Sequence, residues 1–199
     1  MHPSDGGRRA AVTAYLAGPD VFLPDAPEHA RRKVEICARH GILGRPPLNE
    51  DAESLGSLPD DEAWRAIFRK DLAMMEECHS VIANLTPFRG AGADPGTVYE
   101  LGYMAGRRKL CLAYSNDGAV YADRLGRFMD VTSDDGRLVD AQGLTVEDFG
   151  LVDNLMMIHA LELHGCPLVT PATMPIDVWH DLAAFETCVL MAAARLIAT

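Results

Sequence analysis

Short apolar runs alternate along this chain with longer stretches in which apolar residues recur at helical spacing. The apolar runs predict buried strands at residues 11–17, 42–48, 80–85, 109–114 and 166–169, and Pro46-Pro47 weakens the second of them. Helical spacing predicts helices over residues 25–39, 59–79, 97–107, 151–163 and 176–197. Strands and helices therefore alternate along most of the chain.

This alternation predicts an α/β fold, a flavodoxin-like or Rossmann-like parallel sheet of about five strands with helices on both faces, plus an extra C-terminal helix. We expect residues 1–10 to be disordered or poorly ordered and residues 11–199 to form a single domain. Ligands of such sheets bind outside the carboxyl ends of the strands, which places the Gly- and Pro-rich loop at residues 86–96 beside the ligand. The polar segment at residues 115–149 is long for a connection and predicts a lid or an irregular excursion.

Composition narrows the classes of function. The 199-residue chain is 48% hydrophobic and can close a sizeable core, and its formal charge of −11 argues against a nucleic-acid polymer as partner. No apolar run is long enough to span a membrane, and the five cysteines are scattered without the spacing of metal ligands. We therefore expect a cytoplasmic protein in a reducing compartment, with no metal site and no membrane partner.

Two acidic residues, Asp94 and Glu100, flank the predicted start of the helix at residues 97–107. We expect a carboxylate there to stay ionised, because unpaired backbone N–H groups and the helix dipole favour an anion. Glu100, in the first turn and just beyond the end of a strand, is placed to attack an anomeric carbon. Acidic residues are also common in first turns for purely structural reasons, and spacing alone favours that interpretation.

Four short motifs occur in order along the chain: YLAGPD from Tyr15, FRKDLAMM around Asp71, DPGTVYELGY from Asp94, and DNLM from Asp153. Together, over roughly residues 15–157, they resemble the nucleoside 2-deoxyribosyltransferases. In that family a glutamate in the Glu-Leu-Gly-Tyr context attacks C1′ of a 2′-deoxynucleoside and expels the base. The resemblance implies that Glu100 is this nucleophile and that no cofactor is needed.

The resemblance also implies roles for three residues around the nucleophile. Asp71 is expected to protonate or hydrogen-bond the leaving base, and Tyr15 to orient the carboxylate of Glu100 by a hydrogen bond. Without the resemblance, Asp71 reads as an exposed helix carboxylate and Tyr15 equally well as a core residue. Asp94 is expected to bind the sugar 5′-hydroxyl. Related nucleoside-monophosphate N-hydrolases have a serine there, so Asp94 favours free nucleosides, although it could be an ordinary capping aspartate.

Further substrate contacts are expected from the loops of these motifs. Gly18, Asp20 and Gly96 lie within them, and Phe22 could supply an apolar wall on which the base stacks, although loop packing is the more common role of such a residue. Asn154 and Met156 resemble a segment that crosses from a neighbouring subunit in the family and completes its site. The resemblance therefore implies a homo-oligomer, in which dimers assemble further into a hexamer.

The leading hypothesis is base exchange on 2′-deoxynucleosides by a retaining ping-pong mechanism, through a covalent deoxyribosyl ester on Glu100. The alternative within enzymes is hydrolysis of the N-glycosidic bond of a nucleoside or its 5′-monophosphate. A module that binds a nucleotide without catalysis is a third possibility, because a fold of this kind does not define a function. The preference for purine or pyrimidine bases stays open, because the base-facing loops at residues 21–26 and 48–58 cannot be derived from the sequence.

Overall fold

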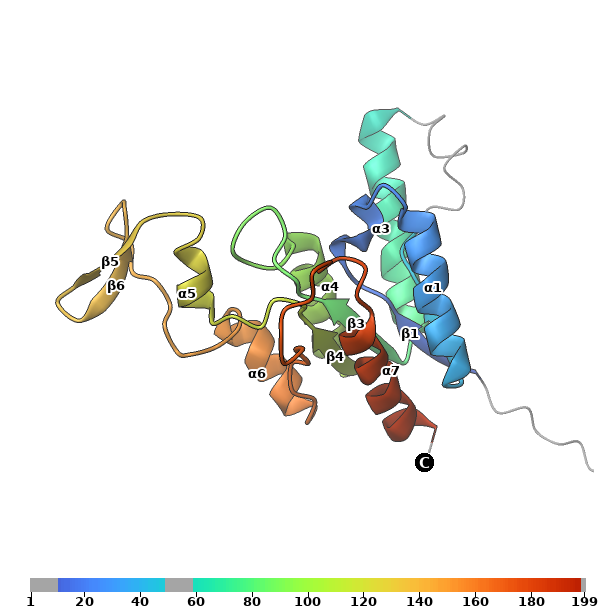
Figure 1. Ribbon diagram of the computed structural model, residues 1–199. Helices are drawn as coiled ribbons and strands as arrows, with labels where there is room; N and C mark the ends of the chain where they lie inside the picture. The colour runs from blue at the N-terminus through green and yellow to red at the C-terminus, as the bar shows by residue number, and fades with distance from the viewer. Residues whose placement is uncertain (1–10, 49–58, 198–199) are drawn as a thin grey trace, which may run out of the picture.

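Four parallel strands form the central sheet of the computed structural model, which describes residues 11–48 and 59–197 (Figure 1). The strands are β1 (Val12–Tyr15), β2 (Ile42–Arg45), β3 (Ser80–Asn84) and β4 (Leu110–Tyr114), and their order across the sheet is β2-β1-β3-β4. The predicted disorder at residues 1–10 and most of the predicted base-facing loop at residues 48–58 lie outside the described residues.

Helices cover both faces of the sheet, as the alternation of strands and helices predicts. The helices α1 (Ala26–Arg39) and α7 (Ala183–Leu196) pack on one face, and α3 (Asp60–Glu77), α4 (Pro95–Gly106) and α6 (Leu155–Leu163) pack on the other. Successive strand residues point to opposite faces, so Ala14 joins the core under α1 and α7 whereas Tyr15 joins the core under α3 and α4. The predicted α/β fold is thus confirmed.

The predicted fifth strand at residues 166–169 is reduced to a single parallel bridge between Tyr114 and Val169. Val169 N donates to the carbonyl of Ala113, and Ser115 N donates to the carbonyl of Val169. Pro167 has no N–H to give to a ladder, which limits how far pairing can extend along this edge.

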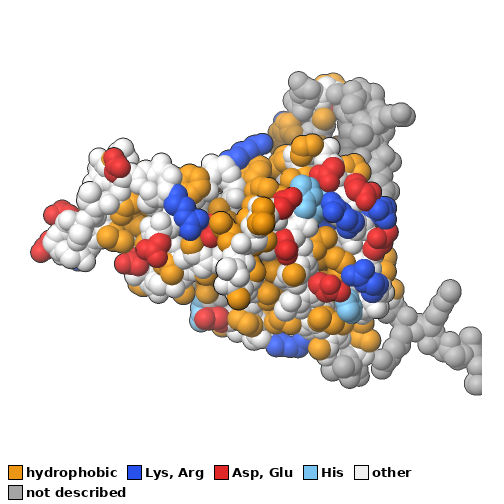
Figure 2. Space-filling model, viewed as in Figure 1, with side chains coloured by type: hydrophobic (Ala, Val, Ile, Leu, Met, Phe, Trp, Pro, Cys, Tyr) orange, Lys and Arg blue, Asp and Glu red, His pale blue; other side chains and the backbone are white. Residues whose placement is uncertain are grey.

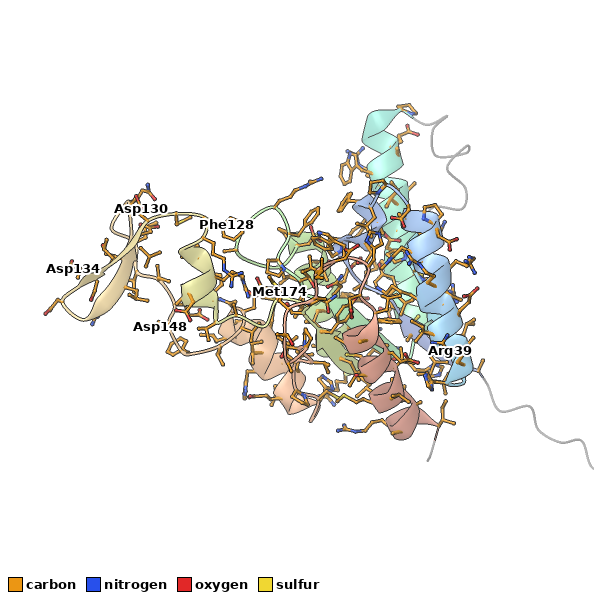
Figure 3. The ribbon with its side chains drawn as sticks, in the orientation of Figure 1. Arg39, Phe128, Asp130, Asp134, Asp148 and Met174 are labelled. Carbon is orange, nitrogen blue, oxygen red and sulfur yellow. The ribbon has the colours of Figure 1, made fainter. Side chains whose placement is uncertain are left out.

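The segment at residues 116–153 leaves the sheet and forms an arm at the left of Figure 1. It holds the short helix α5 (Tyr121–Leu125) and an antiparallel hairpin of β5 (Val131–Asp134) and β6 (Arg137–Asp140). The hairpin turns at Asp135 and Gly136, whose positive φ angles of 47° and 77° suit the twist of the two strands. The irregular excursion predicted here therefore has regular structure of its own. Exposed acidic residues, among them Asp130, Asp134 and Asp148, lie on this arm (Figure 3).

Two predicted helices begin later than the sequence pattern indicates. The helix α6 begins at Leu155 because Asn154 caps it, with the Asn154 side chain accepting a hydrogen bond from Met156 N. The helix α7 begins at Ala183 instead of residue 176, because the side chain of Asp177 accepts hydrogen bonds from the N–H groups of Trp179 and His180 and holds a turn there.

Charged side chains of both signs are interspersed over α1 (Figure 2). Arg31 bonds Glu28 one turn away on this helix, and Arg32 pairs with Asp25 at its N-cap. Within residues 11–48 and 59–197, no helix combines the length and the apolar character that a membrane span requires.

Candidate active site

A cavity of about 480 Å³ lies where loops after β1, β2 and β3 meet the helices α3 and α4. This is the place that the parallel sheet predicts for a ligand. Its described lining consists of Gly18, Val21, Phe22, Pro47, Leu48, Ile67, Asp71, Asp94, Gly96, Thr97 and Glu100. Six of the ten predicted site residues line it: Gly18, Phe22, Asp71, Asp94, Gly96 and Glu100.

Glu100 and Tyr15 are brought together from α4 and β1. The hydroxyl of Tyr15 donates a hydrogen bond of 2.5 Å to Oε1 of Glu100, and the Tyr15 side chain is completely buried. Tyr15 points to this face because residues of β1 alternate between the two faces of the sheet. The contact that the sequence motifs imply between these two residues is present, and it fixes one oxygen of the carboxylate.

The charge state of Glu100 differs from the sequence-based expectation. Burial raises the pKa of Glu100 to about 7; the hydrogen bond from Tyr15 lowers it, while the charges of Asp71 and Asp94 add to the increase. The helix dipole does not keep this carboxylate ionised, because Glu100 lies in the second turn of α4 rather than the first, where the dipole acts most strongly. Desolvation therefore dominates, and Glu100 titrates near neutral pH.

Asp71 supplies a second carboxyl group to the same cavity from α3. Burial raises its pKa to about 6, with Lys70 acting in the opposite direction. Its Oδ1 is buried and receives no hydrogen bond from the described residues, although a buried carboxylate oxygen normally has a partner. Asp71 is therefore not the exposed helix carboxylate of the alternative interpretation, and it can carry a proton near neutral pH.

Asp94 is the N-cap of α4 and also lines the cavity. Its Oδ2 accepts hydrogen bonds from N and Oγ1 of Thr97 at 2.8 and 3.0 Å. A Cβ at Gly96 would lie only 3.1 Å from that Oδ2, so glycine leaves room for the capping carboxylate. The capping role left open in the sequence is thus present, in a residue that also faces the cavity.

Gly18 and Asp20 occupy different positions relative to the cavity. Gly18 lines it, and a Cβ at Gly18 would lie 2.9 Å from Cβ of Asn84, so only glycine fits there. Asp20 is buried and absent from the described lining; its Oδ2 lies 2.5 Å from Nζ of Lys33, and its Oδ1 accepts a hydrogen bond of 2.7 Å from Nδ2 of Asn84. Both carboxylate oxygens of Asp20 are thus engaged inside the protein, where they hold the loop that carries Phe22.

Asn154 and Met156 lie at the start of α6, outside the described lining of the Glu100 cavity. Asn154 lines a separate cavity of about 430 Å³ at the base of the arm, and Met156 is 72% exposed. The neighbouring Asp153 is buried, forms an ion pair with Arg124 at 3.3 Å and accepts a hydrogen bond from Ala93 N.

Several supporting residues escape sequence reasoning. Among them, Lys33 has the clearest signal in the sequence. It falls on the apolar stripe of α1 between Ala30 and Cys37, where a charge needs a buried partner. Asn84 gives a weaker signal, as the polar last residue of a buried strand. Arg124 lies in a polar segment where the sequence offers no sign that it is buried.

The chain is similar to known proteins along most of its length. Residues 14–156 match the model of the family described as nucleoside 2-deoxyribosyltransferase. An uncharacterized protein of Schizosaccharomyces pombe is 31% identical over 194 residues, which cover 92% of this chain and 89% of that protein. A solved structure, a 2-desoxiribosyltransferase from Leishmania mexicana, matches with a TM-score of 0.60 and 28% identity over 89% of this chain and 97% of that chain. The chain thus belongs to the nucleoside 2-deoxyribosyltransferase family.

Proposed function

We propose that this enzyme transfers 2-deoxyribose between nucleobases, with Glu100 as the nucleophile on C1′. The observation that carries the proposal is the hydrogen bond of 2.5 Å from Tyr15 to Glu100, at a cavity that Asp71 and Asp94 also line. A nucleophilic carboxylate must be held in one orientation, and a second carboxyl group must serve the leaving group. Family membership supports the same reaction.

The reaction proceeds in two displacements at C1′. In the first, an oxygen of Glu100 bonds to C1′ while the bond between C1′ and the base nitrogen breaks, and the electron pair of that bond leaves with the base. Asp71 gives its proton to the departing base. In the second, a nitrogen of an incoming base bonds to C1′, Glu100 leaves as carboxylate, and the proton returns to Asp71. Two inversions retain the configuration at C1′.

The first displacement requires Glu100 ionised and Asp71 protonated. Because the pKa of Glu100 is about 7 and that of Asp71 about 6, this form is a minor one, and its population is greatest between these two pKa values, near neutral pH. The hydroxyl of Tyr15 favours the ionised form of Glu100, since its hydrogen bond lowers the pKa.

Asp94 supports free nucleosides as substrates in preference to nucleoside 5′-monophosphates. Its carboxylate lines the cavity, and a phosphate beside it would bring two like charges together. Its Oδ2 already accepts two hydrogen bonds from Thr97, so we propose that Oδ1 accepts one from the sugar 5′-hydroxyl.

The test is a base-exchange assay. Deoxyinosine and free adenine, incubated with the enzyme without phosphate, should give deoxyadenosine and hypoxanthine, and Glu100→Gln should abolish the exchange. Glu28→Gln, on an exposed turn of α1, is the matched control and should exchange at the wild-type rate. Release of free base without exchange, across a panel of purine and pyrimidine acceptors, would instead identify a hydrolase.

We also propose that the enzyme works as a homo-oligomer in which Asn154 and Met156 complete the site of a neighbour. The exposure of Met156 and the position of both residues outside the described lining of their own Glu100 cavity support this arrangement. If it is correct, a mixture of the inactive Glu100→Gln variant and the weakened Met156→Ala variant should regain activity. In a mixed assembly, one site combines Glu100 of the Met156→Ala subunit with Met156 of the Glu100→Gln subunit, so that this site is intact. Additive activities after subunit exchange would refute shared sites.

A further inference from the structure

The segment at residues 175–182, which we call the strap, precedes α7 and lies outside the residues that match the family model. It has no helix or strand, yet it is held firmly. The buried Asn116, just after β4, donates from Nδ2 to the carbonyls of Val178 at 2.7 Å and Asp181 at 2.9 Å. Nε2 of His180 lies 3.1 Å from Oδ1 of Asp25, at the N-cap of α1. The strap is therefore tied to two separate elements of the fold.

The strap carries Trp179, which connects it to the wall of the cavity through two further rings. Trp179 contacts Phe88 edge to face, with ring centroids 6.0 Å apart at 89°. Phe88 in turn stacks on Phe22, with centroids 5.4 Å apart at 12°, and Phe22 lines the cavity that contains Glu100. Trp179 is thus connected to the described cavity wall through Phe88 and Phe22.

Phe22 needs such support because the residue is 57% exposed. An aromatic ring at the edge of a cavity loses affinity for a ligand when it must first be ordered. Phe88 covers one side of the ring, and the guanidinium of Arg89 lies near both rings, 5.1 Å from the centroid of Phe22 and 4.6 Å from that of Phe88. Phe88 and Arg89 thus support the ring of Phe22, which lines the cavity as a flat surface against which a planar ring can stack.

We propose that Trp179 is a positioning residue for the base of the substrate, which stacks on Phe22. This inference rests on the proposed function, since the planar group presented to Phe22 is taken to be a nucleobase. Trp179 touches neither Glu100 nor the sugar in this arrangement. Its loss should therefore weaken the binding of both the donor nucleoside and the acceptor base and leave the displacement at C1′ almost unchanged.

The test compares Trp179→Ala, Trp179→Leu and Trp179→Phe in the exchange assay. Ala and Leu should each raise KM for the acceptor base about threefold to tenfold, the range for loss of one aromatic pair, while kcat stays within about twofold of wild type. Phe retains an aromatic edge and should restore KM. Trp64→Ala, which removes the other tryptophan of the chain from an exposed position on α3, is the matched control and should change neither constant.

Leu keeps apolar volume at position 179, so it decides the outcome if the Ala variant fails to fold. The proposal is overturned if the folded Ala or Leu variant has a wild-type KM, if kcat falls while KM is constant, or if Phe fails to restore KM. Failure of the proposed function has a different signature, because the wild-type enzyme would then show no exchange with any acceptor base.

Discussion

Replacing Glu100 with Gln should stabilise the protein, and the gain should grow as the pH rises. The pKa of Glu100 is raised from 4.5 to about 7 in the folded protein, chiefly by burial. A carboxyl group with a raised pKa binds its proton more tightly in the folded than in the unfolded chain. Its contribution therefore lowers stability as the pH increases from about 4.5 to about 7 and is constant above that range.

The size of the effect follows from the two pKa values. Ionisation of Glu100 costs about 3 kcal/mol of stability at pH 8 and about 1 kcal/mol at pH 5. Gln has nearly the same shape, does not titrate, and its carbonyl can still accept the hydrogen bond from Tyr15. We therefore expect the stability gain of Glu100→Gln to be about 2 kcal/mol larger at pH 8 than at pH 5, which corresponds to a Tm difference of about 4–8 °C.

Urea unfolding monitored by circular dichroism at pH 5, 6.5 and 8 measures this dependence. Glu28→Gln is the control, since the hydrogen bond from Arg31 lowers the pKa of Glu28 and this variant should show no gain at high pH. If Glu100→Gln changes stability by the same amount at pH 5 and pH 8, burial does not raise the pKa of Glu100 and the reasoning is refuted.

Three other predictions concern the same site and its support. The pH profile of kcat/KM should be bell-shaped, with an acidic limb near pH 6 and an alkaline limb near pH 7. Asp71→Asn should remove the alkaline limb and lower kcat about 100-fold or more. An unchanged alkaline limb would exclude Asp71 as the acid. Tyr15→Phe should move the alkaline limb to higher pH and lower the maximum, because loss of the hydrogen bond from Tyr15 raises the pKa of Glu100, the higher of the two; an alkaline limb that stays in place contradicts this. Arg124→Met should destabilise the protein by about 3–5 kcal/mol in urea unfolding, and adding Asp153→Asn should recover part of the loss, because the single variant leaves a buried carboxylate unpaired.

The sequence predicts the layered fold well because its strands are continuous apolar runs, the pattern of a parallel sheet covered on both faces. The sequence predicts the ends of helices less reliably where a side chain accepts the hydrogen bonds of backbone N–H groups. Asp177 and Asn154 each accept backbone hydrogen bonds that delay the start of a helix, and apolar spacing does not register such a bond. Pro167 similarly limits the last strand to one bridge.

The candidate catalytic residues can be found in the sequence because they lie in short motifs, whereas the residues that support them cannot. The partners in the pairs Asp20–Lys33 and Arg124–Asp153 are 13 and 29 residues apart, and a single sequence does not indicate which distant charges meet. The ionisation of Glu100 was mispredicted for a related reason. Burial, which dominates the pKa of Glu100, depends on how α4 packs against the rest of the protein. The effect of the helix dipole, by contrast, can be inferred from neighbouring residues in the sequence.

The cap of α4 has an evolutionary consequence. Asp94 begins the helix and also lines the cavity, and the residues that cap helices well form a small set of Ser, Thr, Asn and Asp. Within this set a change of residue keeps the helix start intact while it replaces a negative charge at the cavity with a neutral hydrogen-bonding group. If Asp94 faces the sugar as proposed, single substitutions at this position change the charge that the substrate meets while the start of α4, and with it the fold, is kept.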